Sequence, residues 1–176
     1  MSLEQTKEYP LSDADIRTIL GDDIKITPYP MLKNMKSINE CFDKKGRAII
    51  LFLTTSPTEG HWCCMLRKRK GIEFFDPYGE IPDSGQKKGM SRSLLESLDE
   101  SQPDLTALMR ASGRPIFYNN YQFQRDSQKV STCGRHCVAR CLYAPYNLDK
   151  YATIIRKSKL SPDDFVTGLT YDKLRK

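Results

Sequence analysis

The sequence "HWCCMLRKRKGIEFFDPYG", residues 61–79, contains two apolar runs separated by a basic turn that includes Gly71. Apolar runs on either side of a short polar segment with glycine are typical of a β-hairpin, here with a loop of about four residues. Pro77 ends the second strand, because proline cannot donate a hydrogen bond to a strand ladder. We therefore predict two antiparallel strands in this stretch.

A longer apolar run, "RAIILFLTT" at residues 47–55, precedes the hairpin and lies between Gly46 and Pro57. An apolar run of this length between turn residues predicts a strand that is buried on both faces of a sheet. A further β-rich run, "PIFYNNYQFQ", covers residues 115–124. Together these segments predict a central mixed or antiparallel β-sheet.

Segments with helical signals surround the predicted strands. In "LSDADIRTILG", residues 11–21, Ser12 and Asp15 have the pattern of a capping box, and Gly21 can end the helix. Further helices are predicted in two pieces within residues 82–113, at residues 133–144, and after Ser161. A sheet flanked by helices in this order predicts an α+β fold.

Length and composition describe an ordinary globular chain. Its 176 residues suit one domain, residues 1–176, and its 39% hydrophobic and 28% charged residues exclude disorder and fibrous repeats. We find no apolar run approaching about 18 residues and no signal-peptide pattern, so we expect a soluble, intracellular protein without a membrane partner. The net charge of +6 favours polyanionic partners or is simply that of a basic surface.

Three cysteines lie four residues apart in "STCGRHCVARC", residues 131–141. Intracellular cysteines are expected to stay reduced unless they are catalytic or redox-active. Four-residue spacing places Cys137 and Cys141 on one helix face, where small apolar side chains pack into a core. A zinc site with ligands from two segments is the alternative. Its candidate ligands are Cys133, His136 and Cys137 together with His61, Cys63 and Cys64.

Cys133 differs from the other two because it lies where a polar loop meets the first turn of the predicted helix. Backbone N–H groups and the helix dipole at such a position lower the pKa of a thiol and favour the thiolate nucleophile. Gly134, the next residue, would let a substrate backbone come close. A buried structural cysteine is the alternative interpretation.

A nucleophilic cysteine also needs a base, and the chain has two histidines. His136 follows Cys133 by three residues, but we expect its ring to lack a fixed orienting partner. His61 begins the first strand of the hairpin, and Asp76 ends the second. The hairpin can therefore supply both an imidazole and a carboxylate.

The register of the hairpin decides whether these two groups meet. Pairing of Arg67 with Ile72 would place Cys63 opposite Asp76. His61 would then face the same side of the hairpin as Asp76, roughly 7 to 8 Å away at the backbone, a gap that the two side chains can bridge. A slip of one residue would send them to opposite faces and leave a histidine unrelated to the aspartate.

A thiolate, an imidazole and a carboxylate make the Cys-His-Asp arrangement for acyl transfer, which also requires donors to an oxyanion. The backbone N–H of Cys133 can supply one donor. A side-chain amide from the preceding segment can supply another, and the candidates are Gln122, Gln124 and Gln128.

Four motifs in this order resemble the adenovirus maturation protease (adenain) and ubiquitin-like-protein protease superfamily of cysteine proteases. They are "GHW" at residues 60–62, "FFDPYG" at 74–79, "YNNYQFQ" at 118–124 and "TCGRHC" at 132–137. The sequence looks most similar to the maturation proteases of large DNA viruses, virophages and Polinton-type elements, from about Leu11 through Arg140. Each motif alone is weak, whereas the four together are specific.

The resemblance implies a papain-like-related, adenain-type cysteine protease fold with the nucleophile at a helix N-terminus. It implies Cys133 as nucleophile, His61 as general base and Asp76 as the group that orients His61. It implies no metal. Thr132 departs from the aspartate that often precedes the cysteine in deconjugating members.

The resemblance also implies Gln124 as the oxyanion donor. Gln128 is the alternative, because nine positions separate Gln124 from Cys133, more than is usual in the family. Trp62 and Gly134 would lie in the substrate cleft, which in the family admits small residues near the scissile bond.

The implied function is that of a viral cysteine endopeptidase that cleaves capsid or minor capsid precursors at small-residue, Gly-X type sites during particle maturation. A monomer is expected, acting in the host cell cytoplasm (virus factory) and in the virion. No cofactor would be required, although DNA or a viral peptide could act as an activator. The basic cluster "RKRKG", residues 67–71, could meet such a polyanion or simply be solvated. The alternatives are a protease that removes ubiquitin-like modifiers and a non-enzymatic zinc- or nucleic-acid-binding module.

Overall fold

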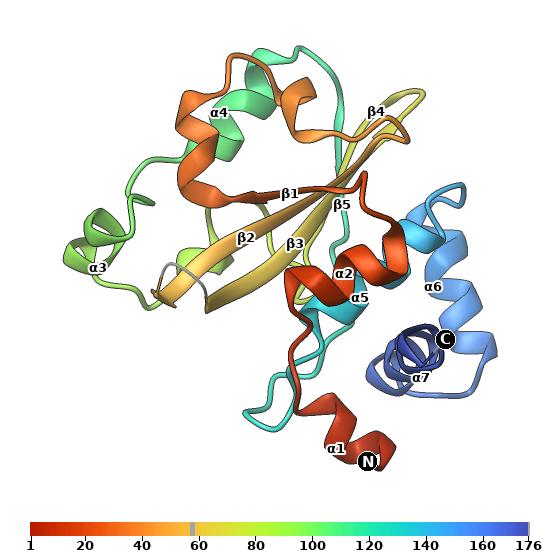
Figure 1. Cartoon of the computed structure of the whole chain (residues 1–176). Coiled ribbons are helices and arrows are strands. Elements are labelled where there is room, and N and C mark those ends of the chain that lie inside the picture. Colours follow the sequence, from red (N-terminus) through yellow and green to blue (C-terminus); the bar gives the residue numbers. More distant parts are fainter. Residues whose placement is uncertain (57–58, 176) are drawn as a thin grey trace.

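The computed structural model describes residues 1–56 and 59–175, and it contains a five-stranded sheet in the order β1-β2-β3-β4-β5 (Figure 1). The strands β2, β3 and β4 are antiparallel, whereas β1 and β5 add to the edges in parallel. The sheet is therefore mixed, as predicted. Its strands are β1 (Lys25–Pro28), β2 (Arg47–Ser56), β3 (Glu59–Lys68), β4 (Gly71–Phe75) and β5 (Ile116–Tyr118).

Helices cover both faces of this sheet, which confirms the α+β fold class (Figure 1). One face packs against α4 and two early 3-10 helices, and the other against α2, α5, α6 and α7. The α-helices are α1 (Leu3–Lys7), α2 (Asp13–Leu20), α3 (Arg92–Ser97), α4 (Asp104–Ala111), α5 (Cys133–Leu142), α6 (Leu148–Lys157) and α7 (Pro162–Leu174). The 3-10 helices are η1 (Tyr29–Asn34), η2 (Ile38–Cys41) and η3 (Gly85–Lys87).

The β3-β4 hairpin has the predicted register, with Arg67 paired to Ile72. The loop is shorter than predicted, because Lys68 also pairs with Gly71 and only residues 69–70 form the turn. Since the register is set by the pairs further along the strands, this correction leaves the side-chain parity unchanged. His61 and Asp76 therefore extend from the same end of the hairpin.

Strand β2 is buried on both faces, as its apolar sequence predicted. Alternate residues enter the two cores, so that Ile49 and Leu51 belong to one hydrophobic cluster and Ile50 and Phe52 to the other. This alternation follows from the two-residue period of a strand. The two cores fix the sheet between its helical layers.

Helix α5 is the most deeply buried helix among the described residues, with nine of its ten residues in the buried class. It packs against β3, and Arg140 forms a bidentate ion pair with Glu73 of β4, with N–O distances of 2.7 and 2.9 Å. Cys137 and Cys141 are free thiols in the core beneath the sheet, as predicted from their spacing. The helix is thereby held in place along its length.

The helix boundaries agree with the local signals where these were strong. The capping box of Ser12 and Asp15 is present at α2, and Gly21 follows it with a positive φ of 98°. Helices α1 and α6 were not predicted, although Asn147 caps α6 through its side chain. None of the helices within residues 1–56 and 59–175 has the length and apolar character needed to cross a bilayer.

The run at residues 115–124 forms a shorter strand than predicted. Only Ile116–Tyr118 pairs with β4, and the chain after Tyr118 leaves the sheet. The Asn119 side chain bonds to the backbone of Asp76, and the N–H groups of Phe123 and Gln124 donate to the Pro77 carbonyl. This irregular segment lies beside the hairpin end that carries Asp76.

Candidate active site

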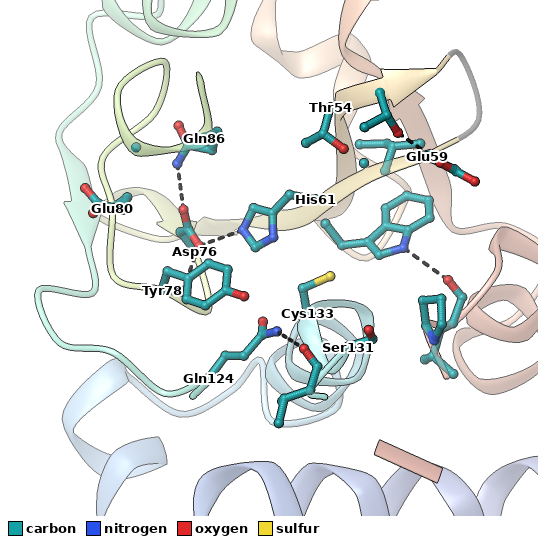
Figure 2. Close-up of a pocket in the computed structure, with 18 of the residues that line it drawn as sticks. Thr54, Glu59, His61, Asp76, Tyr78, Glu80, Gln86, Gln124, Ser131 and Cys133 are labelled. Atoms are coloured by element: carbon teal, nitrogen blue, oxygen red, sulfur yellow. Dashed lines mark hydrogen bonds and ion pairs between the residues drawn. The ribbon is translucent and has the colours of Figure 1, made fainter. Parts of the chain in front are cut away.

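Cys133 is the first residue of α5 and lines a groove together with His61 and Asp76 (Figure 2). Its side chain is 9% exposed, and it faces the end of the hairpin that carries His61 and Asp76. Thr132 precedes it with φ −102° and ψ 5°, outside helical geometry. The sulfur thus lies where unpaired backbone N–H groups begin a helix, as the sequence predicted.

His61 and Asp76 form the pair that the hairpin parity predicted. His61 Nε2 lies 2.8 Å from Asp76 Oδ1, and the ring of Tyr78 stacks on the imidazole with centroids 5.1 Å apart. The other side of the imidazole faces Cys133 (Figure 2). The structure therefore brings together the three residues on which the sequence prediction depends.

The charges of Cys133 and His61 stabilise each other. Burial alone would lower the pKa of His61, but hydrogen bonds to Asp76 and Cys133 raise it to about 10. Burial alone would raise the pKa of Cys133, but the hydrogen bond to His61, its charge and the backbone N–H groups of Trp62 and Gly134 hold it below the usual value. Both shifts favour the thiolate and imidazolium pair over the pair of neutral groups.

Asp76 is fixed by partners that the sequence prediction did not include. Gln86 Nε2 donates to Asp76 Oδ2 at 2.7 Å, and the Tyr78 N–H donates to Oδ1 at 2.8 Å. Asn119 holds the backbone of Asp76 through both ends of its amide, at 3.0 and 2.5 Å. Asn119 is part of the quoted "YNNYQFQ" motif, whereas Gln86 comes from η3 and has no local signal. These hydrogen bonds restrict movement of the Asp76 carboxylate away from His61.

The three candidate glutamines lie in different environments. Gln124 is 2% exposed and borders the groove with Cys133, whereas Gln128 is exposed and lies outside the residues that border it. Gln122 is exposed at the groove and donates to the Gln124 carbonyl at 2.7 Å. The position of Gln124 therefore suits an oxyanion donor better than that of Gln128.

The Gln124 amide is only loosely bound. Its Nε2 lies 3.3 Å from the Val130 carbonyl, and its Oε1 is buried without a hydrogen-bond partner among the described residues. A long bond of this kind contributes little, so the N–H groups can turn to a stronger acceptor in the groove.

Trp62 borders the groove, and its Nε1 donates to the Leu11 carbonyl at 3.1 Å. The groove has a volume of about 1180 Å³ and extends from α2 past the Cys133 sulfur to the segment with Gln124. Gly134 directly follows Cys133 in α5 and is buried. A Cβ at Gly134 would lie 3.1 Å from atoms of Leu11 and Trp62, so a larger residue there would require these neighbours to shift slightly. A role of Gly134 in the approach of a substrate stays a prediction.

The chain is 31% identical over 173 residues to "Uncharacterized protein V9" of Sputnik virophage, and the match covers 96% of this chain and 98% of that protein. This chain belongs to the V9 family. No protein-family model matches it. Membership of the V9 family agrees with a viral origin of virophage type, and by itself it assigns no chemistry to the groove.

A metal site in this V9-family chain would need a different ligand set from the one considered from sequence. Within residues 1–56 and 59–175, the group whose donor atoms lie close together, within 4.8 Å, is His61, Cys63 and Asp76. Two of these form the pair beside Cys133, and burial raises the pKa of the Cys63 thiol well above its usual value. A metal there would have to displace the bond between His61 and Asp76.

His136 has a fixed partner, contrary to expectation. Its Nε2 donates to Asp163 Oδ1 at 2.9 Å, and the ring is completely buried and does not border the groove. Burial lowers the pKa of His136 more than Asp163 raises it, so the ring is neutral. His136 is therefore neither a ligand partner of Cys137 nor a second candidate base.

Proposed function

We propose that this V9-family chain is a cysteine endopeptidase of the adenain type that cleaves virion precursor proteins during particle maturation. The observation that carries the proposal is the alignment of Cys133, His61 and Asp76 in one groove. A thiolate beside an imidazole that a carboxylate orients is the arrangement of acyl-transfer enzymes on several unrelated folds. The chain would act as one papain-like-related protease domain.

Acylation would begin with attack of the Cys133 thiolate on the carbonyl carbon of the scissile peptide. The oxyanion that forms would accept hydrogen bonds from the Cys133 N–H and from Gln124 Nε2, released from its 3.3 Å contact with Val130. The His61 imidazolium would give its proton to the departing amine, which leaves a thioester on Cys133 and a neutral imidazole.

Deacylation would use the same residues in the reverse roles. Neutral His61 would take a proton from water as it attacks the thioester carbonyl, and the Cys133 thiolate would leave as the carboxylic acid product forms. The hydrogen bond to Asp76 engages Nε2 of His61 in both half-reactions. Nδ1 is therefore the nitrogen that would exchange protons with the leaving amine and the water. The imidazolium and thiolate pair is thereby restored.

Two aromatic side chains support a preference for small residues at the scissile bond. Trp62 and Tyr78 both border the groove next to Cys133, and each is anchored, Trp62 to the Leu11 carbonyl and Tyr78 against His61. Fixed aromatic walls near the nucleophile restrict the space for substrate side chains, which suits Gly-X type sites. Capsid and minor capsid precursors would be the substrates, in the virus factory and the virion.

The test is incubation of the purified chain with the capsid and minor capsid proteins encoded beside it, followed by mass spectrometry of the products. We expect cuts after small residues by the wild type and none by Cys133→Ala, with both proteins folded alike by circular dichroism. Cleavage by Cys133→Ala at the same sites would overturn the proposal. Release of a C-terminal fluorophore from intact ubiquitin-like proteins, but not from short Gly-Gly peptides, would instead favour removal of modifiers.

A further inference from the structure

Asp163 is a buried carboxylate behind the candidate site, in the first turn of α7. Its side chain accepts three hydrogen bonds, and the residue is only 6% exposed. The Thr132 hydroxyl and His136 Nε2 donate to Oδ1 at 2.6 and 2.9 Å, and the Arg125 backbone N–H donates to Oδ2 at 3.0 Å. Thr132 directly precedes Cys133, Arg125 directly follows Gln124, and His136 lies one helical turn after Cys133.

Two of these donors fix the start of α5. Thr132 directly precedes Cys133, and His136 lies one turn further along the same helix. The Thr132 side chain makes no capping bond to α5 among the described residues, because its hydroxyl binds Asp163 instead. Asp163 therefore helps to hold the start of α5, which carries the backbone N–H of Cys133.

The third donor fixes the segment that carries Gln124. The N–H groups of Phe123 and Gln124 donate to the Pro77 carbonyl, at 2.8 and 2.9 Å, next to Asp76. The following N–H, that of Arg125, donates to Asp163. Gln124 is thus held between two anchors, one beside Asp76 and one beside Cys133.

The covalent connection between Gln124 and Cys133 does not fix their distance. Residues 125–131 form no helix or strand and are exposed or partly exposed. Through Asp163 the two segments are instead joined by one carboxylate, with one oxygen for each segment. An oxyanion site needs its two donors at a fixed separation, and this bridge supplies one.

The charge of Asp163 suits this role. Burial would raise its pKa, but the hydrogen bonds from His136, Thr132 and Arg125 hold it below the usual value, so it stays ionised. His136 is neutral, so the bridge consists of an anion with three neutral donors. Such charge-assisted bonds are shorter and stronger than bonds between neutral groups.

We propose that Asp163 is a positioning residue of the oxyanion site, which holds the amide of Gln124 at a fixed distance from the backbone N–H of Cys133. The proposal rests on the proposed function. It extends the site to α7, 30 residues beyond the nucleophile. Asp163 touches neither the sulfur nor the imidazole of His61, so it acts only through the two segments that it joins.

Asp164 supplies a matched control. It lies in the same first turn of α7 and also carries a carboxylate, which caps the helix with Ser161 and pairs with Lys7. Asp164→Ala therefore removes an acidic residue from the same helix end without touching Arg125 or Thr132. Any effect of Asp163→Ala that Asp164→Ala lacks belongs to the bridge.

The experiment measures kcat and KM on a Gly-X peptide for Asp163→Ala, Asp164→Ala, Gln124→Ala and the double variant of Asp163 and Gln124. Alkylation of Cys133 by iodoacetamide is followed in parallel by peptide mass spectrometry. Alkylation passes through no oxyanion, so it reports the thiolate and imidazolium pair alone.

We expect Asp163→Ala to lower kcat by about 10- to 100-fold with KM nearly unchanged, since removal of an oxyanion donor costs about 100- to 1000-fold. The alkylation rate should stay at the wild-type value, and Asp164→Ala should hydrolyse at the wild-type rate. The double variant should hydrolyse about as fast as Gln124→Ala alone, because residues that act through one another are not additive. Asp163→Asn keeps the shape and one oxygen, and we expect an intermediate kcat.

Any of three results would overturn the proposal. The first is the same kcat for Asp163→Ala as for Asp164→Ala, and the second is a loss of kcat in the double variant equal to the product of the two single losses. The third is an alkylation rate of Asp163→Ala that falls as much as its kcat. If Asp163→Ala does not fold, Asp163→Asn decides by the same comparisons. A wild type that hydrolyses no peptide under conditions where Cys133 is alkylated would refute the proposed function instead.

Discussion

The molecule contains two histidine and aspartate pairs with nearly the same geometry. His61 Nε2 lies 2.8 Å from Asp76, and His136 Nε2 lies 2.9 Å from Asp163. The first pair borders the groove beside Cys133, whereas the second is sealed between α5 and α7. Under the proposed function the first pair transfers protons, whereas the second holds the start of α5.

The two imidazoles differ in charge because their second nitrogens differ in surroundings. Burial lowers both pKa values, but His61 also faces the Cys133 sulfur, and its pKa rises to about 10. Nδ1 of His136 has no hydrogen-bond partner within the described residues, and its pKa falls below the usual 6.5. A neighbouring aspartate is therefore not enough to make a base, and the contact with a thiolate decides the role.

The two pairs should differ most in activity when the imidazole of each pair is removed by mutation. His61→Ala should lower kcat/KM by about 10⁴-fold or more, because acylation and deacylation both pass a proton through this imidazole. The protein should stay folded by circular dichroism, because Gln86 and Tyr78 still bind Asp76. Retention of more than about a tenth of the wild-type rate would show that His61 is not the base.

His136→Leu should lower stability and have little effect on turnover. It removes one donor to Asp163 and leaves the groove intact, so we expect a loss of about 1–3 kcal/mol in the free energy of unfolding, measured with urea. Turnover should fall by less than about tenfold, because Thr132 and Arg125 still bind Asp163. A loss of turnover as large as that of His61→Ala, in a folded protein, would erase the distinction between the pairs.

Gln86→Leu tests how firmly the first pair is held. It removes the 2.7 Å bond to Asp76 Oδ2 but keeps the bonds from Tyr78 and His61. We expect kcat to fall by roughly 3- to 10-fold, in line with about 0.5–1.5 kcal/mol for one hydrogen bond. Gln128→Ala, an exposed glutamine outside the groove, is the control and should keep the wild-type rate.

The smallest expected effect is on the pH dependence of stability. The pKa of His136 is lowered in the folded chain, so unfolding lets it take up a proton below its ordinary pKa of about 6.5. The wild type therefore loses stability as the pH falls below about 6.5, by at most about 1.4 kcal/mol per pH unit from this group. His136→Leu lacks this loss, so its stability deficit should shrink from pH 7 to pH 5. A constant deficit would mean that His136 titrates normally.

The sequence predicted those parts of the site that depend on short-range patterns. The pairing of Arg67 with Ile72 follows from the turn between two apolar runs, and it fixes the shared face of His61 and Asp76. Cys133 was predicted at a helix start because loop and helix signals meet there. These features depend on neighbours in one hairpin or one helix.

The supporting residues could not be predicted in the same way. Gln86 and Asp163 reach the site from η3 and α7, and no periodicity links either of them to the motifs with His61, Asp76 and Cys133. The tight packing at Gly134 also comes from tertiary contacts, because Leu11 and Trp62 lie 3.1 Å from the position of a Cβ there. The surroundings of Gln86, Asp163 and Gly134 all depend on contacts between segments that are distant in the sequence.

The central claim is that Cys133 and His61 form a charged pair, and histidine NMR tests it most directly because the chain has only two histidines. The account predicts that in the wild type one imidazole is charged at pH 7 and titrates near pH 10, while the other stays neutral. His136→Leu should remove the neutral signal, and Cys133→Ala should lower the pKa of the charged one by removing its anionic partner. Two imidazoles that are both neutral at pH 7 and do not respond to Cys133→Ala would contradict the account.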